Sequence, residues 1–389
     1  MEKVRIGMVG CGGIGQVHFS YLNQVKGAEL TAVCDIDPAP LKAAMDKMGV
    51  PGFEDYRALV DSGLCDAIII GTPHYFHPEI MMYAFGKGLH VLSEKPVGVH
   101  VNHAKAMIAT AAKHPDLVFG VMFQSRTRPY VKKAKEMVDS GELGRLLRAT
   151  CLETAWYRTQ AYYDSGGWRA TWGGEGGGVL LNQCPHTLDV FTYLAGSPKR
   201  VIAMVKLGNR HNIEVEDEVS AILEYENGAF GQFITSTGEA PGSSILELAF
   251  DRGLLRLEEG KVLFRRNRIP TFEHLKTSQE RFEKPERWDI NLPLGPAPSG
   301  SKPHQPITQN FVNAILKGEK LIAPGQDGIH GLELGNAILM SGLSGGKPVD
   351  LPLDGDAMEA LIKDLCAKST FVKPETKKAS AADMTSSFH

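Results

Sequence analysis

The chain begins MEKVRIGMVGCGGIG (1–15), and this stretch decides the expected fold. An apolar run over 4–9 leads into Gly10, Gly12 and Gly15, which are spaced as GxGxxG, and an amphipathic segment over 14–25 follows. In such a unit the first glycine makes the tight turn, the second lets the backbone approach a pyrophosphate, and the third lets the helix pack on the strand. The stretch therefore predicts a dinucleotide site, with an ordinary glycine turn as the alternative.

An acidic residue, Asp35, closes the next apolar run, GAELTAVCD (27–35), twenty residues after Gly15. A carboxylate at this place accepts hydrogen bonds from the adenosine ribose hydroxyls and repels a 2′-phosphate. Asp37 adds to that repulsion, and no Arg or Lys follows before Lys42. We therefore expect a preference for NAD over NADP.

The composition indicates an ordinary globular protein with a small-molecule partner. With 389 residues, 43% hydrophobic and 22% charged, the chain suggests two domains. A net charge of −3 provides no electrostatic footprint for nucleic acid or an anionic membrane. No apolar run approaches the ~20 residues of a membrane span, and the first strand starts at once, so a cytoplasmic location is expected.

The six cysteines are widely scattered, which favours buried free thiols over disulfides. Zinc ligands can be imagined in the pair Cys184 and His186, or in His74 and His77. Because the chain has no CxxC and no HExxH, no metal is expected.

The first part of the chain alternates strand and helix patterns, which is typical of βαβ units in a doubly wound parallel sheet. A domain over residues 1–125 is expected to bind the dinucleotide. The predicted strands lie near 4–9, 29–34, 67–70, 89–92 and 118–122, and the predicted helices near 14–25, 38–48, 76–86 and 100–113.

After Pro129 the pattern changes to longer alternating stretches, which indicate antiparallel strands with turns at ENGA (226–229) and DRG (251–253). We expect this second, α/β domain to span 126–372 and to bind the substrate and mediate oligomerisation. Residues 373–389 are polar and predicted to be a disordered tail. Helices are expected near 131–139, 306–317, 327–344 and 355–367, with a long loop over 271–306.

Several motifs are spread along both parts of the chain. They are GCGGIG (10–15), GTPHYFH (71–77), HVLSEKP (90–96), GELG (141–144), GGGVLLNQCPHTLD (176–189) and the run NFVNAIL (310–316) to PGQDGIHGLELGNAILMS (324–341). Together these motifs make the chain similar to the Gfo/Idh/MocA family of oxidoreductases. The resemblance implies an N-terminal Rossmann domain, a C-terminal α/β domain with a large open, mostly antiparallel sheet, and a homodimer or homotetramer formed through that sheet.

The resemblance also implies NAD as the cofactor and assigns contacts to it at matching positions. His77 has an alternative role as a cap of the helix that follows it. The implied contacts are Gly10, Gly12, Gly13, Ile14 and Gly15 at the pyrophosphate, Asp35 at the ribose, and Thr72, Pro73, His77, Glu94, Lys95 and Gln124 on the nicotinamide side.

The first candidate catalytic residue is Lys95, which lies just beyond the predicted fourth strand, where open α/β sheets bind ligands. An ammonium group stabilises a developing alkoxide, and burial lowers its pKa toward working pH. By resemblance, this lysine contacts the reacting hydroxyl, and a cis peptide bond precedes Pro96.

The second element is Asn182 with His186, which share one face if the segment is helical. The resemblance assigns proton transfer to His186 and places an Asp where this chain has Asn182. Since Asn182 carries no charge, it cannot raise the pKa of His186 as a carboxylate would. His186 is the first choice for the general base and Lys95 the second. The alternatives are a helix N-cap for Asn182 and a core histidine for His186.

Aromatic and arginine side chains surround this pair and favour a polyhydroxylated ring as substrate, because Trp and Tyr stack on its C–H faces and Arg donates paired hydrogen bonds. Packing in a core or a subunit contact is the alternative for these aromatics. By resemblance, Trp168 and Arg169 are the best specificity candidates. Tyr157, Arg158 and His304 are further candidates for substrate contact.

We therefore expect an NAD-dependent dehydrogenase acting on a secondary hydroxyl of a sugar, glycoside or cyclitol, with C3 as one candidate position. A second hypothesis is a glycosidase that retains NAD, oxidises C3 transiently and cleaves the glycosidic bond by β-elimination. A third is an NAD sensor without catalysis, against which Lys95 and His186 argue.

Overall fold

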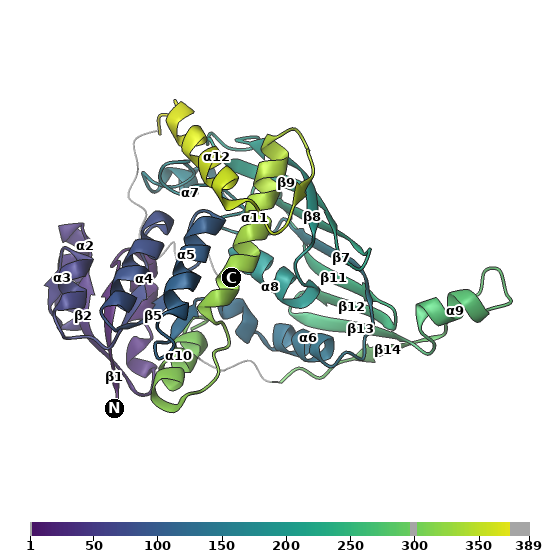
Figure 1. The fold of residues 1–389 in the computed structure, drawn as a ribbon, viewed down its shortest axis with the longest axis horizontal. Helices are drawn as coiled ribbons and strands as arrows, with labels where there is room; N and C mark the ends of the chain where they lie inside the picture. The colour runs from purple at the N-terminus through teal and green to yellow at the C-terminus, as the bar shows by residue number, and fades with distance from the viewer. Residues whose placement is uncertain (1, 296–301, 374–389) are drawn as a thin grey trace.

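The computed structural model of the protein describes residues 2–295 and 302–373 (Figure 1). Its first layer is a fully parallel sheet, as the alternating pattern predicted, and its six strands lie in the order β3-β2-β1-β4-β5-β6. The two-residue strand β3 was not predicted. Buried strands such as Ile68–Ile70 are apolar throughout because both faces of the sheet are covered. The strands are β1 (Val4–Val9), β2 (Ala28–Cys34), β3 (Gly52–Phe53), β4 (Ala67–Ile70), β5 (His90–Ser93) and β6 (Phe119–Val121).

The helices of this first part agree with the predicted ones, with one exception. The helix predicted over 14–25 is divided: α1 ends at Phe19, and a short 3₁₀ helix occupies Leu22–Gln24. The hydroxyl of Ser20 donates to the carbonyl of Val17, which competes with helix continuation. The helices are α1 (Gly13–Phe19), α2 (Pro38–Met48), α3 (Tyr56–Asp61, not predicted), α4 (His77–Gly86) and α5 (Val101–Ala112).

The second layer is a nine-stranded sheet in the order β14-β13-β12-β11-β7-β10-β9-β8-β15, and it is antiparallel except between β7 and β10. The turns predicted at 226–229 and 251–253 join β9 to β10 and β11 to β12. Its strands are β7 (Leu146–Glu153), β8 (Arg200–Leu207), β9 (Glu216–Glu224), β10 (Phe230–Ser236), β11 (Ser244–Phe250), β12 (Gly253–Glu258), β13 (Lys261–Asn267), β14 (Arg287–Asn291) and β15 (Val349–Asp350).

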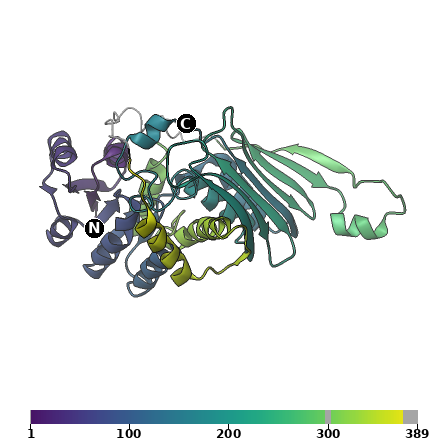
Figure 2. The same ribbon diagram turned by 90° about the horizontal axis from the view of Figure 1, so that it is seen from above.

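Helices lie on one face of this second sheet, between it and the first part of the chain, and leave its other face open (Figures 1 and 2). One of them, α10, packs against β1 and β5, so a segment distant in sequence completes the first layer. The helices are α6 (Pro129–Asp139), α7 (Gln160–Asp164), α8 (Pro185–Ala195), α10 (Gln305–Lys317), α11 (Gly328–Leu343) and α12 (Gly355–Lys368).

The long loop predicted over 271–306 is wrong at two places, where a helix and a strand form. Helix α9 (Thr271–Thr277) and strand β14 form an arm that projects from the end of the sheet (Figure 2). Strand β14 forms because it satisfies the backbone groups of β13, a partnership that local composition does not reveal. Residues 296–301 of the predicted loop lie outside the described residues.

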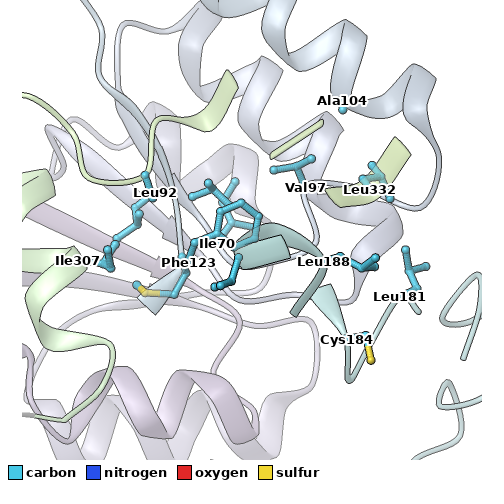
Figure 3. Packing of buried hydrophobic residues seen from close by; sticks show 14 of the residues in the cluster. Ile70, Leu92, Val97, Ala104, Phe123, Leu181, Cys184, Leu188, Ile307 and Leu332 are labelled. Carbon is cyan, nitrogen blue, oxygen red and sulfur yellow. The ribbon is translucent and has the colours of Figure 1, made fainter. Parts of the chain in front are cut away.

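The two layers share one core, which places the loop after β5 against the segment before α8. Figure 3 shows Ile70, Leu92 and Phe123 beside Leu181 and Leu188. A Cβ on Gly176 would lie 2.3 Å from a methyl group of Val99, so the glycine run allows this close approach.

All six cysteines are free thiols, and five of them are buried, as predicted. Among the described residues, no helix is long and apolar enough to span a bilayer. The predicted disordered tail lies outside the described residues from 374 onward, but Lys373 is described and donates a 2.6 Å hydrogen bond to the carbonyl of Tyr163.

Candidate active site

The glycine-rich turn leaves open space where a pyrophosphate would lie. A Cβ on Gly10 would stand 2.5 Å from the carbonyl oxygen of Gly71, and one on Gly15 would stand 2.3 Å from that of Gly10. In contrast, a Cβ on Gly12 would meet nothing within 4 Å. Gly13 and Ile14 begin α1, whose first N–H groups no described side chain caps. The turn therefore fits a dinucleotide phosphate.

Asp35 follows β2 directly, and backbone amides hold its carboxylate in place. One oxygen accepts a 2.7 Å hydrogen bond from the amide of Cys11, and the other accepts one of 2.9 Å from the amide of Asp37. The side chain of Asp37 is itself the N-cap of α2, because it accepts from the amide of Ala39. Backbone hydrogen bonds therefore already orient the carboxylate of Asp35, which is the group predicted to bind the ribose.

Two buried polar atoms on the predicted nicotinamide side have no hydrogen-bond partner in the described parts of the chain. They are the hydroxyl of Thr72, beside Pro73 in the loop after β4, and the side-chain oxygen of Gln124, which follows β6. Buried polar groups are normally paired, so these atoms are suited to contact a ligand. The contact of Thr72 and Gln124 with the cofactor stays a prediction, which these unpartnered atoms favour.

His77 is placed differently from either sequence interpretation. Its Nε2 lies 2.7 Å from the carbonyl oxygen of Thr72 and its Nδ1 lies 2.8 Å from that of Pro96. Both ring nitrogens therefore contact the backbone, and the ring joins the loop after β4 to the loop after β5. The cap interpretation is wrong, because the N-cap position of α4 is Phe76.

Glu94 and His304 lie together in a buried polar group. Glu94 contacts His18 at 2.8 Å, and Nδ1 of His18 lies 2.6 Å from the hydroxyl of Tyr21. His304, predicted at the substrate, packs within this group: its Nε2 is 3.9 Å from Glu94, and its ring stacks on Tyr21. Burial lowers the pKa of His304 to about 4, so it is neutral at neutral pH.

Lys95 reaches across to the second part of the chain, where its Nζ donates a 2.8 Å hydrogen bond to the backbone carbonyl of Asn182. The peptide bond between Lys95 and Pro96 is cis, as predicted. Burial lowers the pKa of Lys95, while the carboxylates of Glu94 and Glu175 oppose that shift.

His186 is buried, with 7% of its surface exposed, and neither ring nitrogen has a hydrogen-bond partner among the residues that the structure describes. Its pKa lies well below the ordinary value, first because of burial and then because the ammonium of Lys95 is nearby. The ring is therefore neutral at neutral pH and able to accept a proton. A core histidine would instead have its nitrogens satisfied.

The predicted common helix face of Asn182 and His186 is wrong. Helix α8 begins at Pro185, a residue favoured at the first helical position, so Asn182 lies in the turn before it. The N-cap position is Cys184, which also excludes the cap interpretation of Asn182. Instead, the amide nitrogen of Asn182 contacts Glu175 and lies 3.3 Å from the hydroxyl of Tyr162.

Three of the predicted specificity residues, Arg158, Trp168 and Arg169, lie close together around Tyr162. His304 does not, because it lies in the buried group around Glu94. Arg169 donates to the hydroxyl of Tyr162 at 2.8 Å, and both Arg158 and Arg169 lie over the ring of Tyr162, at 5.0 and 4.6 Å from its centroid. The ring of Trp168 meets that of His74 edge-on at 5.9 Å. Tyr157 is 49% exposed and lies at the surface beside this group.

Buried charges hold α8 in position. Asp189, one turn after His186, pairs with Arg126 at 2.5 Å, and Arg126 also reaches Asp327 at 2.6 Å. The carboxylate of Glu216, at the start of β9, holds the turn before α8. It accepts hydrogen bonds of 2.9 Å from the amide of Gly178 and 3.1 Å from the amide of Leu180. Such pairs fix where His186 can point.

Comparison with known proteins decides the family. A model described as "Oxidoreductase family, NAD-binding Rossmann fold" matches residues 4–122, and one described as "GFO/IDH/MocA C-terminal domain" matches residues 131–256. The chain belongs to the Gfo/Idh/MocA family. It is thus an oxidoreductase with an NAD-binding Rossmann domain, which confirms the predicted family, fold class, enzyme class and cofactor.

Relatives within the Gfo/Idh/MocA family act on sugars and cyclitols. The chain is 26% identical over 263 residues to inositol 2-dehydrogenase of Corynebacterium glutamicum, covering 66% of this chain and 74% of the relative. It is 27% identical over 249 residues to glucose-6-phosphate 3-dehydrogenase of Bacillus subtilis, covering 61% and 69%. The solved WlbA dehydrogenase of Chromobacterium violaceum, in complex with NADH and UDP-GlcNAcA, superposes with a TM-score of 0.76 at 27% identity, covering 91% and 97%.

Three residues of this Gfo/Idh/MocA site were not among the predicted site residues: His74, Tyr162 and Glu175. His74 was considered only as a metal ligand, and nothing in the sequence showed that His74 contacts Trp168 or that Tyr162 contacts Arg169. Glu175 offered a signal that was missed. An acidic residue inside a glycine run that packs closely must itself be buried, and a buried carboxylate requires partners.

Proposed function

We propose that this protein is an NAD-dependent dehydrogenase that oxidises a secondary hydroxyl of a sugar, sugar derivative or cyclitol. The observation that carries the proposal is the neutral, buried ring of His186, which has no described hydrogen-bond partner and stands near the ammonium of Lys95. A substrate hydroxyl placed between these two groups receives a hydrogen bond from one and can give its proton to the other.

The chain's own residues divide the work as follows. Lys95 donates to the reacting oxygen and stabilises the alkoxide as it develops, because an ammonium group is stabilising there. His186 accepts the hydroxyl proton, and its lowered pKa keeps it unprotonated beforehand. Bound NAD supplies the acceptor for the hydride that leaves the same carbon. Thr72 and Gln124 offer their unpartnered polar atoms to the nicotinamide side.

The substrate proposal is finer than the family membership. Trp168 provides an aromatic surface for the C–H face of a ring, and Arg169, fixed by Tyr162, provides donors for its oxygens. Among relatives, one is named for inositol and one for the C3 position of glucose 6-phosphate. We therefore extend the proposal to the C3 hydroxyl of a pyranose as the first position to examine.

A homo-oligomer through the open face of the second sheet is part of the proposal. Ile202, Met204, Ile222 and Phe230 are 41 to 68% exposed on that face, and Ile202 lies opposite Ile222 across β8 and β9. An apolar patch of this kind on a sheet is typical of a subunit contact. The buried free thiols fit the reducing cytoplasm, where we place the protein.

A screen for NADH formation tests the activity. The purified protein is incubated with NAD and a panel of pyranoses, their glycosides, uronates and cyclitols, and absorbance at the NADH band is followed. Stoichiometric NADH with one of these substrates supports the dehydrogenase. Cleavage of a glycoside without net NADH would instead support the glycosidase hypothesis, and NAD binding without turnover of any compound would support the sensor.

A further inference from the structure

A buried carboxylate, Glu175, lies at the centre of the candidate site in a place that the proposed mechanism does not use. It stands within the glycine run and is 1% exposed. Its Oε2 accepts a 2.6 Å hydrogen bond from the amide of Ala170, and its Oε1 contacts the side-chain nitrogen of Asn182. One carboxylate thus connects the loop of Trp168 and Arg169 to the turn before α8.

The contact with Glu175 determines how the amide of Asn182 is oriented. Burial raises the pKa of the Glu175 carboxyl, while the guanidinium of Arg169 and the hydrogen bonds that Glu175 accepts oppose that shift and favour the ionised form. The ionised carboxylate accepts hydrogen bonds but does not donate them, so the atom of Asn182 that faces it is the NH₂ group. The second N–H of that group points to the hydroxyl of Tyr162, at 3.3 Å. Both donors of Asn182 are therefore occupied, and its Oδ1 is the atom left to accept a hydrogen bond from a substrate hydroxyl.

Glu175 also supplies negative charge on the substrate side of Lys95. The charged and titratable groups around Lys95 come from every neighbouring segment. Glu94 precedes it in the chain, and its carboxylate is engaged by His18. The other groups that interact with Lys95 are the cations Arg158 and Arg169, the carboxylate Glu175, the thiol Cys184, and the histidines His74, His77, His186 and His304.

We infer that Glu175 is a positioning residue that replaces the carboxylate missing at position 182: it keeps Lys95 in the ammonium form and holds Asn182 with its oxygen toward the substrate. This inference rests on the proposed function of the site. It explains how an uncharged residue can stand at position 182, since the negative charge comes from the neighbouring glycine run instead.

The first test removes the negative charge of Glu175 but keeps a side chain of the same size and shape. In Glu175→Gln, the amide oxygen can still accept from Ala170, while Lys95 loses a nearby negative charge. We expect kcat to fall roughly 10- to 100-fold with a smaller change in KM. This is the size of effect that the loss of one charge-assisted hydrogen bond produces. The alkaline limb of the kcat profile moves to lower pH, because the ammonium form of Lys95 is less favoured.

A charge exchange sharpens the test. Asn182→Asp alone places a second carboxylate against Glu175, and two adjacent carboxylates cannot both ionise, so activity falls. The double variant Glu175→Gln with Asn182→Asp has one carboxylate again, and it recovers most of the activity lost in either single variant. If Asn182→Asp is as active as the unchanged protein, with the same pH profile, the inference is wrong, and this result does not depend on whether Glu175→Gln folds.

A readout without turnover separates this inference from the proposed function. The reactivity of Lys95 toward an acylating reagent is measured against pH in the NAD-free protein by mass spectrometry, and its midpoint gives the pKa of Lys95. Glu175→Gln is expected to lower that midpoint. The matched control is Glu333→Gln, because Glu333 is also buried and accepts from a backbone amide, that of Leu353, but in α11.

The outcomes are distinct. A lowered midpoint in Glu175→Gln, with none in the control, supports the inference even if every sugar in the screen fails as a substrate. An unchanged midpoint overturns it even if the dehydrogenase activity is found.

Discussion

The Nζ of Lys95 donates a 2.8 Å hydrogen bond to the backbone carbonyl of Asn182, which joins the loop after β5 to the turn before α8. The two residues are 87 positions apart in the chain. Through this bond the ammonium group from the NAD-binding part is held beside the segment that carries His186. The site therefore exists because the two layers share a core.

Removing the imidazole should separate catalysis from cofactor binding. For His186→Ala we expect kcat to fall about 10²- to 10⁴-fold, the usual contribution of a general base. The affinity for NADH, followed by fluorescence titration, should stay unchanged. His330→Ala, at an exposed position on α11, serves as the control. Near-normal kcat with an unchanged pH profile in His186→Ala would remove the base assignment.

The pH dependence of the unchanged enzyme follows from two lowered pKa values. Because the pKa of His186 lies well below its ordinary value of 6.5, the ring stays unprotonated near neutral pH, and kcat/KM should show no acidic limb near 6.5. Lys95, whose pKa is lowered from 10.5, must keep its proton, so activity should fall on the alkaline side. A limb near 6.5 in the unchanged enzyme that disappears in His186→Ala would show that His186 titrates there and would contradict this prediction.

The cofactor preference depends on Asp35. Asp35→Ser removes the ribose acceptor and the repulsion of a 2′-phosphate, so kcat/KM for NAD should fall about 10-fold while that for NADP rises. The ratio of the two kcat/KM values is the measurement. Asp46→Asn is a matched control, because it removes the charge of an exposed carboxylate on α2 to which no cofactor contact is assigned. A better value with NADP in the unchanged protein would refute the preference.

The buried pair of Arg126 and Asp189 should matter for stability. Arg126→Met leaves a carboxylate buried without its cation, which costs about 3–5 kcal/mol in the free energy of unfolding. The urea midpoint measures the change. The control is Arg5→Met, since the side chain of Arg5 is 47% exposed and water screens its pair with Asp66, so its loss should change the urea midpoint little. Equal effects of the two substitutions would mean that burial does not govern the contribution of Arg126.

The oligomer proposal can be tested at the open sheet face. Phe230→Glu puts a charge into the apolar patch, where Phe230 is 62% exposed, and should shift the protein to smaller species in size-exclusion chromatography with light scattering. Phe282→Glu makes the same change on the projecting arm, where the ring is 93% exposed. Dissociation by Phe282→Glu alone would assign the contact to the arm instead.

Local patterns in the amino-acid sequence predicted most of the first layer and the cofactor class, although the short elements α3 and β3 were not predicted. Gly10, Gly12, Gly15 and Asp35 lie within one βαβ unit, so their spacing along the chain is also their arrangement in space. The same holds for the turns 226–229 and 251–253, because a hairpin joins neighbouring strands. The edge strand β14 was missed because its partner, and not its own composition, makes it a strand.

Only the tertiary structure showed how the candidate catalytic residues are brought together and oriented. The sequence already contained Lys95, Asn182 and His186, but α8 begins at Pro185, so Asn182 could not be oriented by helical spacing. Its orientation comes from Glu175 and Tyr162, whose contacts depend on how the glycine run folds against the core. Hydrogen bonds and desolvation act between atoms that folding brings together, so the pKa values and free polar atoms that define this site have no counterpart in the order of residues alone.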